Sequence, residues 1–286
     1  MTNAVVWKVP GSHEVWAVAD SRVTLTGPRS SNAVIPRVTD QAMKVLRLEV
    51  VAHGETKVTQ PVMPFIGYDV GMVFAGAVTP ALMTHAAASM MLSNLFPQLE
   101  GPRIWLPSFA NVTELLCHLS ATYIRDAAVA YSMSNPPMCE FVVFAQPPLP
   151  SLDPGPISAY RIRPSFDALG IFQQVAEEID LEGGEIAVIG DDAESLREEA
   201  IHLMKAEHPA YRGVEPRIAL ERRMQARTHP TVGGTLQFGI MSHGRVSLYG
   251  ASRDSHGNPL QNWLGFDCQT DIRQILGMPV VIPSRL

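Results

Sequence analysis

The chain has 286 residues, of which 46% are hydrophobic and 17% are charged, and its formal net charge at pH 7 is −6. This length and composition fit one or two globular domains with a sizeable core. The acidic balance argues against nucleic acid or an anionic membrane as the main partner, because either one calls for clustered Lys and Arg.

The cysteines and histidines give no sign of a metal site or a disulfide framework. Cys117, Cys139 and Cys268 stand far apart, and the nine histidines show no H-x-x-x-H or H-E-x-x-H spacing. We therefore expect no metal and no cofactor, and a reducing cytoplasm as the compartment. The N-terminus lacks a signal-peptide pattern and no apolar run reaches the roughly 18 residues of a membrane helix, so no membrane contact is expected.

The first part of the chain predicts strands. β-rich runs flank Pro10-Gly11-Ser12, which is typical of a hairpin, and the second run could extend through residues 22–26. Residues 27–41 and 52–68 are expected to be irregular, the latter because of Pro61 and Pro64. The strands are predicted over residues 3–9, 14–20, 43–51 and 69–76.

Two helices are predicted next. Thr79 and Pro80 suit an N-cap followed by proline at the first helical position, and this helix would run to about Leu95. Asn111 and Glu114 suit a capping box at the start of a second helix, whose apolar residues follow the helical period as far as about residue 131.

The second half repeats the order of strands and then helices. A proline-rich turn over residues 146–156 separates the first two of its strands, and the last two form a hairpin that turns at Ser242-His243-Gly244. Strands are predicted over residues 139–145, 157–163, 185–190, 235–241 and 244–249, and helices over 192–206 and 214–227. Residues 251–286 have little periodicity and are expected to form a C-terminal extension packed on a domain of residues 1–250.

The grouping of the elements predicts the fold class. Strands follow strands and helices follow helices, which favours layers over a parallel βαβ fold. We expect an α+β protein with a four-layer αββα sandwich, in which two stacked antiparallel sheets are flanked by helix pairs. This arrangement would bury every apolar stripe.

Three segments carry a resemblance to a known family. They are residues 19–24 (Ala-Asp-Ser-Arg-Val-Thr), 44–48 (Lys-Val-Leu-Arg-Leu) and 73–76 (Val-Phe-Ala-Gly), and Ala187–Gly190 and Val232–Gly234 give weaker support. In this order the chain resembles the proteasome β-subunit family of N-terminal-nucleophile (Ntn) hydrolases, closely over residues 2–95 and loosely over 138–249. The resemblance implies the Ntn type of sandwich and no cofactor.

The resemblance implies a catalytic set of Thr2, Asp20, Lys44 and Gly76. Thr2 would be the nucleophile once Met1 is removed, and its own α-amine, with an ordinary pKa near 8, would take the hydroxyl proton. Lys44 would keep that amine neutral and Asp20 would orient Lys44. Gly76 would offer its backbone N–H to the developing oxyanion.

Each of these residues also has a reading unrelated to catalysis. Thr2 is a common kind of second residue, and Asp20 could simply end a strand. Lys44 could be an exposed strand residue, and Gly76 could be only a turn between a strand and a helix.

The loop between Asp20 and Lys44 is several residues longer than is usual in the family, and the sequence also departs from the pattern of active members in two supporting segments. Asp191 follows Gly190 where a serine is usual, and His229-Pro230-Thr231-Val232-Gly233-Gly234 stands where the family has Asp-x-x-Ser-Gly-Gly. Asp191 could accept a hydrogen bond from the α-amine, and His229 could replace the missing acid. Both are hypotheses about residues that support the nucleophile.

The substrate pocket would be lined by residues from several of these segments, if the register of the family carries over. Their side chains would favour an apolar substrate group, with core packing as the alternative, above all for Phe74. The residues are Val23, Thr24, Ala42, Phe74 and Val78.

The sequence therefore favours a proteasome-like threonine hydrolase that cleaves peptide or amide bonds and forms a homo-oligomer, a ring or related array. An exposed apolar stripe on the helix of residues 79–95 or 111–132 could form the subunit contact. Two alternatives stay open: a non-catalytic assembly protein with the same fold, and an Ntn amidase for a small molecule.

Overall fold

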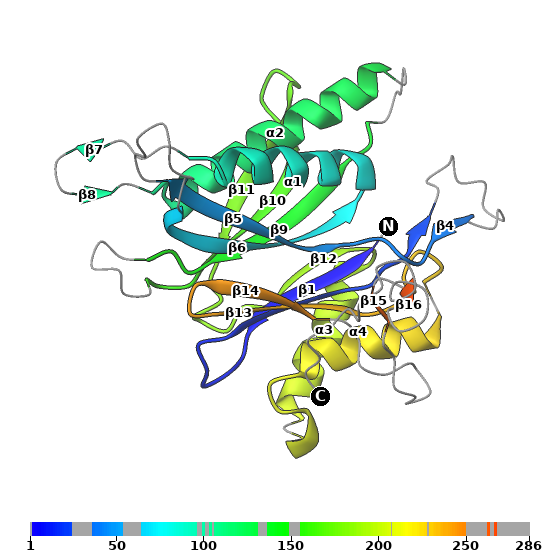
Figure 1. The fold of residues 1–286 in the computed structure, drawn as a ribbon. Coiled ribbons are helices and arrows are strands. Elements are labelled where there is room, and N and C mark those ends of the chain that lie inside the picture. Colours follow the sequence, from blue (N-terminus) through cyan, green and yellow to red (C-terminus); the bar gives the residue numbers. More distant parts are fainter. Residues whose placement is uncertain are drawn as a thin grey trace.

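The computed structural model describes residues 2–24, 36–53, 64–95, 99–100, 103–104, 106–130, 136–148, 155–206, 208–227, 229–249, 262–263 and 266–267. Two five-stranded sheets lie face to face, with a pair of helices on the outer side of each (Figure 1). The predicted α+β class and the four-layer αββα order are confirmed.

The first sheet contains the start of the chain. All of its neighbouring strands are antiparallel, and β1 lies between β12 and β2. Its order is β12 (Ala187–Gly190), β1 (Asn3–Lys8), β2 (Val15–Ala19), β13 (Gln237–Ser242) and β14 (Arg245–Tyr249).

The second sheet is also antiparallel throughout, with β9 at its centre. Its order is β11 (Phe172–Ile179), β10 (Ser158–Phe166), β9 (Cys139–Ala145), β6 (Pro64–Gly76) and β5 (Val45–His53). Three short two-stranded pairs lie outside the sandwich: β3 (Val23–Thr24) with β4 (Arg37–Thr39), β7 (Leu99–Glu100) with β8 (Arg103–Ile104), and β15 (Asn262–Trp263) with β16 (Phe266–Asp267).

The helices cover the two outer faces. Helices α1 (Val78–Leu92) and α2 (Phe109–Ala130) pack on the second sheet, and α3 (Ala193–Lys205) and α4 (Glu215–Ala226) pack on the first, with a short 3₁₀ turn at Pro209–Tyr211 (Figure 1). None of the described helices is long and apolar enough to cross a membrane.

Side-chain alternation explains why the central strands read as continuous apolar runs. In β1, Ala4 and Val6 enter the cluster between the sheets, whereas Val5 and Trp7 enter the cluster beneath α3 and α4. Because successive side chains of a strand point to opposite faces, a strand buried on both faces has no polar alternation. These four side chains are at most 1% exposed.

Two helix starts were predicted wrongly. Helix α1 begins at Val78, and its N-cap Ala77 makes no side-chain capping bond, so Thr79-Pro80 lies inside the first turn. Helix α2 begins at Phe109, ahead of Asn111, and the Ser108 hydroxyl accepts a bond from the Asn111 N–H at 3.2 Å. Serine is as good an N-cap as asparagine, so the capping residue lies three positions earlier than expected.

The predicted irregular segment 52–68 and the connection before residue 185 also need correction. Strand β5 continues to His53, and β6 already begins at Pro64. Proline is tolerated at the first residue of a strand, where its missing N–H removes little from the ladder. Strand β11 had no counterpart in the prediction, and Val23–Thr24 pairs with β4 instead of extending β2.

Some predictions fall outside the described residues. These are most of the loop 27–41, the centre of the proline-rich turn 146–156, and all but four residues of the extension 251–286. The division into a domain of residues 1–250 and a packed extension therefore stays a prediction.

Strand register defines two ends of the sandwich. Asn3, Ala19, Gly76, Cys139 and Gly190 lie at the end where β1 begins, as the pairs Asn3 with Gly190 and Gly76 with Cys139 show. We call this the Thr2 end. The opposite end carries the turns that connect β1 to β2, β9 to β10, β11 to β12 and β13 to β14.

Candidate functional site

The start of the chain is buried at the Thr2 end. Thr2 is 3% exposed, and its carbonyl accepts a hydrogen bond of 3.0 Å from the Asp191 N–H. Gly190 has φ +108°, and a Cβ built on it would lie 1.6 Å from the Thr2 carbonyl oxygen. Only glycine fits this close approach, so β12 and its turn fix the first residues of β1.

A buried ion pair lies beside this first segment. Asp20 follows β2 and Lys44 precedes β5, and both side chains are 0% exposed, with Lys44 Nζ 3.2 Å from Asp20 Oδ1. The same oxygen accepts the Asn3 N–H at 3.0 Å. The Lys44 ammonium and the peptide that joins Thr2 to Asn3 therefore share one acceptor atom, which brings Lys44 to the start of the chain.

Every oxygen of this carboxylate is occupied. Asp20 Oδ2 accepts the N–H groups of Arg22 at 3.1 Å and Gly233 at 3.0 Å, and the Lys44 ammonium also donates to the Arg22 carbonyl. Backbone donors and a cation favour the ionised form of a carboxyl group, and they compensate for its removal from water. The four donors thus hold Asp20 in a single orientation.

Burial is the largest influence on the protonation of both groups. It lowers the pKa of Lys44 below its ordinary value, while the nearby Asp20 carboxylate acts in the opposite direction. It also raises the pKa of Asp20, against the Lys44 ammonium and three backbone donors. Such paired perturbations are frequent at functional sites and also occur in structural ion pairs.

Gly76 lies at the same end, where β6 passes into α1. Its φ is +99°, and a Cβ there would meet the Met138 carbonyl oxygen at 2.5 Å. Any other residue would strain this turn, so the glycine is required by backbone geometry alone. The structure therefore brings Thr2, Asp20, Lys44 and Gly76 to one end of the sandwich.

Four of the five predicted pocket residues are partly exposed. They are Val23, Thr24, Ala42 and Val78, and the hydroxyl of Thr24 is buried without a hydrogen-bond partner among the described residues. Phe74 is 0% exposed and belongs to the cluster between the second sheet and α1 and α2. Phe74 thus takes the core packing that its sequence context offered as an alternative.

The two supporting residues differ in their surroundings. The Asp191 carboxylate accepts a hydrogen bond from the Thr231 hydroxyl, and the backbone N–H of the same residue donates to the Thr2 carbonyl. His229 Nε2 lies 3.8 Å from the carboxylate of Asp192, the next residue of the β12–α3 turn.

Sequence reasoning missed several residues that complete this region. Arg223 of α4 is 6% exposed and donates to the carbonyls of Asp191 and Asp192. The Gln237 side chain accepts the Lys44 N–H at 2.8 Å. No local sequence pattern distinguishes Arg223 from its neighbour Arg222. Its burial follows from the packing of α4 on β1.

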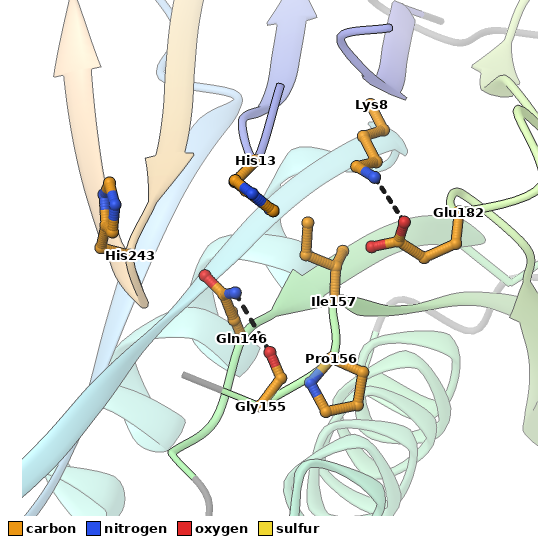
Figure 2. Close-up of a pocket in the computed structure, with 8 residues that line it drawn as sticks. All are labelled: Lys8, His13, Gln146, Gly155, Pro156, Ile157, Glu182 and His243. Carbon is orange, nitrogen blue, oxygen red and sulfur yellow. Dashed lines mark hydrogen bonds and ion pairs between the residues drawn. The ribbon is translucent and has the colours of Figure 1, made fainter. Parts of the chain in front are cut away.

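The opposite end holds a cavity of about 530 Å³ between the turns of the two sheets (Figure 2). An ion pair of Lys8 and Glu182 borders one side, and Gln146 donates to the Gly155 carbonyl at 3.1 Å on another. His13 and His243 are exposed on the two hairpin turns. Among the described residues that line this cavity, none carries a hydroxyl or thiol group.

No part of the described chain brings together three or more His, Cys, Asp or Glu side chains in a group that could hold a metal ion. Cys117 and Cys139 are free thiols. Burial is the main cause that raises the pKa of Cys139 to about 12 and that of Cys117 to about 11, and neither is suited to act as a thiolate nucleophile.

Comparison with solved structures finds chains that align with nearly the whole length of this one. The helical assembly of the Anbu complex from Pseudomonas aeruginosa aligns over 99% of this chain and 99% of its own, with a TM-score of 0.52 and 13% identity. Anbu (ancestral β-subunit) from Yersinia bercovieri aligns over 86% of each chain, with a TM-score of 0.46 and 12% identity. Anbu from Hyphomicrobium sp. strain MC1 aligns over 99% of this chain and 100% of its own, with a TM-score of 0.45 and 12% identity.

No family model and no curated protein sequence matches the chain. The first of the structural matches supports the proteasome-like Ntn sandwich as the fold of this chain. At 13% identity the likeness concerns the fold alone, because one fold hosts many functions.

Proposed function

We propose that this chain, which has the proteasome-like Ntn fold, is a threonine hydrolase that cleaves peptide or amide bonds with Thr2 as its nucleophile. The observation that carries the proposal is the fully buried pair of Asp20 and Lys44, whose shared oxygen also holds the N–H immediately after Thr2. Burial of a lysine ammonium has a large cost in desolvation free energy, and packing alone would be better served by an apolar side chain. A role in function accounts for the presence of this cation at the start of the chain.

The reaction would begin when the α-amine of Thr2 takes the proton of its own hydroxyl, after removal of Met1. The hydroxyl oxygen then attacks the carbonyl carbon of the substrate, and the negative charge moves to the carbonyl oxygen. The Gly76 N–H would donate to that oxygen, a kind of contact typically worth about 10²–10³ in rate. The amine then returns the proton to the leaving nitrogen, which leaves an ester on Thr2.

Water completes the cycle. The α-amine takes a proton from a water molecule, which attacks the ester carbonyl, and the threonine hydroxyl reforms as the acid product departs. Throughout, a charged Lys44 would disfavour a second positive charge on the nearby amine, and Asp20 would keep the Lys44 ammonium in place.

The supporting groups are part of the proposal. Asp191 would accept a hydrogen bond from the α-amine, because its own N–H already holds the Thr2 carbonyl. His229 would act only indirectly, through Asp192. The partly exposed side chains of Val23, Thr24, Ala42 and Val78 would face the substrate and favour an apolar group.

Self-association is proposed as well. Helix α1 exposes Leu82, Met83, Met90 and Met91, which are between 37% and 74% exposed. A cluster of exposed apolar side chains on one helix is typical of a contact surface. The Anbu complex of Pseudomonas aeruginosa forms a helical assembly, and we expect copies of this chain to associate through α1.

Light scattering of the intact protein tests the association. A Met83→Glu, Met90→Glu double variant should reduce the molar mass towards that of one chain. Val129→Glu, at an 80% exposed position on α2, is the matched control and should leave the mass unchanged. An unchanged mass in the α1 variant would remove this surface from the proposal.

The activity is tested in two steps. Intact-mass spectrometry shows whether Met1 is removed, and a panel of fluorogenic peptides and simple amides then separates a peptidase from a small-molecule amidase. Turnover that disappears in Thr2→Ala supports the proposal. A retained Met1, or equal turnover in Thr2→Ala, would contradict it.

One observation favours the non-catalytic alternative. Asp191 and Val232 stand where the resembled family usually carries serines, so the water and the amine would need other partners. Under this alternative the fold and the self-association persist, and every substrate in the panel stays intact.

A further inference from the structure

The turn that joins β12 to α3 encloses the start of the chain. It consists of Gly190, Asp191 and Asp192, and Asp192 has φ +48°, a left-handed conformation uncommon outside glycine. Such a conformation persists only where the surrounding structure holds it. The contacts that hold this turn come from β1, from β9, from α4 and from the segment before β13.

Asp191 is held at its N–H, its carbonyl and its carboxylate. Its N–H donates to the Thr2 carbonyl at 3.0 Å, and its own carbonyl accepts the Asn3 amide at 2.7 Å. The Thr231 hydroxyl donates to carboxylate oxygen Oδ2. The Asp191 side chain therefore has its orientation set by a residue from a different part of the chain.

Thr231 is well placed to set that orientation. It is 4% exposed, and its own segment is anchored because the Gly233 N–H donates to Asp20 Oδ2 at 3.0 Å. A hydroxyl that donates to one carboxylate oxygen restricts rotation of the group and leaves the other oxygen to accept from a different donor. Thr231 thus links Asp191 to the segment that also holds the Asp20–Lys44 pair.

Arg223 fixes the backbone of the turn. One of its terminal nitrogens donates to the carbonyls of Asp191 at 3.2 Å and Asp192 at 3.0 Å, and the other donates to the Ser195 hydroxyl at 3.0 Å. At 6% exposure this guanidinium is largely removed from water. A planar fork that spans two carbonyls and a hydroxyl cannot be reproduced by the single ammonium of lysine.

We infer that Thr231 and Arg223 are positioning residues that hold the Asp191 carboxylate in place to partner the α-amine of Thr2. The inference rests on the proposed function for the role of that amine, and neither residue touches the substrate. Thr231 acts through the Asp191 carboxylate, and Arg223 acts through the backbone of the turn.

Other charged groups around the turn also influence the amine. They lie just after β2, just before β5, on β9, in the turn itself, on α4 and in the segment before β13, and each position keeps its charge in the variants compared below. These groups are Asp20, Lys44, Glu140, Asp192, Arg223 and His229.

The test measures the α-amine directly. The full chain with Thr2 as its first residue is acetylated at a series of pH values, and mass spectrometry follows the modification of Thr2. Because only the neutral amine reacts, the midpoint of the profile reports its protonation whether or not the protein hydrolyses a substrate. A nearby carboxylate stabilises the ammonium, so a misplaced Asp191 moves the midpoint to lower pH.

Thr231→Val should move the midpoint about one pH unit lower, the lower limit expected for losing a close opposite charge. Thr231→Ser keeps the hydroxyl and should restore the wild-type midpoint. Thr113→Val, which removes a comparably buried hydroxyl from α2, should leave the midpoint unchanged.

Arg223→Lys keeps the charge and should shift the midpoint in the same direction as Thr231→Val, whereas Arg217→Lys on the same helix should not.

A double-mutant cycle decides whether Thr231 acts through Asp191. Asp191→Asn should produce the same shift as Thr231→Val, and combining them should add nothing. An unchanged midpoint in Thr231→Val or Asp191→Asn, or additive shifts in the double variant, would overturn the inference. Wild-type protein that shows these shifts but no Thr2-dependent turnover would refute the proposed hydrolase while leaving the positioning role intact.

Discussion

Each end of the sandwich carries a lysine–carboxylate pair, and the two pairs lie in opposite environments. At the Thr2 end the Lys44 and Asp20 side chains are both 0% exposed, whereas at the far end Lys8 and Glu182 are 20% and 48% exposed. The buried pair is completed by backbone donors from three segments, and the exposed pair can exchange its partner for water. Because water can solvate either charge of the Lys8–Glu182 pair, the fold does not depend on that pair. No water is available to the buried Lys44–Asp20 pair, so each of its members needs the other.

Removal of one partner from each pair should give the largest difference between the two ends. Asp20→Ala leaves the Lys44 ammonium buried without its carboxylate, and we expect a loss of about 3–5 kcal/mol in the free energy of unfolding. Lys8→Met should cost at most about 1 kcal/mol, as is usual for exposed pairs. Urea unfolding of both variants measures the difference, and equal losses would contradict this account of the two ends.

A pair of glycines sharpens the comparison. Gly190 at the Thr2 end and Gly184 at the far end both have positive φ, but only Gly190 has the Thr2 carbonyl in the space of a Cβ. Gly184→Ala should cost about 1–2 kcal/mol, the strain of a left-handed alanine. Gly190→Ala adds a steric clash and should cost more while displacing Thr2.

Urea unfolding and the acetylation profile of Thr2 check this second prediction. We expect Gly190→Ala to alter both and Gly184→Ala to alter only the first. Equal stability losses with an unchanged profile would mean that Gly190 does not fix the start of the chain.

Cys139, which pairs with Gly76 at the Thr2 end, gives the pH-dependent prediction. Burial raises the pKa of its thiol to about 12 from the ordinary 9.0. A raised pKa in the folded state means that this contribution to stability is complete below pH 9 and is lost as the pH rises towards 12.

The folded protein should therefore react only slowly with a thiol reagent at Cys139 at mildly alkaline pH, and the unfolded chain should react at once. Cys139→Ala should also weaken the decrease in stability above pH 9, measured by urea unfolding at several pH values. Rapid labelling of Cys139 in the folded protein would contradict the burial of this residue.

The smallest effect is expected at the rim of the far cavity. His13 and His243 are exposed on hairpin turns, so His13→Ala should change stability by less than about 0.5 kcal/mol and should leave any Thr2-dependent turnover unaltered. His243 has φ +52°, and His243→Gly should be neutral or slightly stabilising. A large loss of turnover in either variant would show that the far end participates in the reaction.

The layers and their order could be predicted from the sequence because each central strand and helix carries its own burial signal. Strand β11 could not, because it is a largely polar edge strand whose sequence, Phe172–Ile179, shows no regular alternation. Its place is set by pairing with β10, and the Arg163–Glu177 ion pair joins the two strands. These two residues are 14 positions apart, and pairing between strands adds no periodic pattern to the sequence of either strand.

The residues of the candidate site also fall into two groups, those that the sequence predicts and those that it does not. Asp20, Lys44 and Gly76 stand in short segments with a recognisable order, whereas the role of Thr231 depends on a contact with Asp191, 40 positions earlier. Arg223 and Arg222 are neighbours in sequence, and only the side of α4 that packs on β1 decides which of them is buried. Residues that act through packing between distant elements are therefore the part that sequence patterns miss.

The central claim is that Thr2 is the nucleophile and that Lys44 at the buried end activates it. The most direct measurement is labelling with an epoxyketone, which bonds to both the hydroxyl and the α-amine of an N-terminal threonine, followed by peptide mapping. This account predicts one adduct on Thr2 in the wild-type protein and none in Lys44→Met, provided that circular dichroism shows the variant to be folded. An adduct at any other residue, no adduct in the wild type, or undiminished labelling in folded Lys44→Met would contradict it.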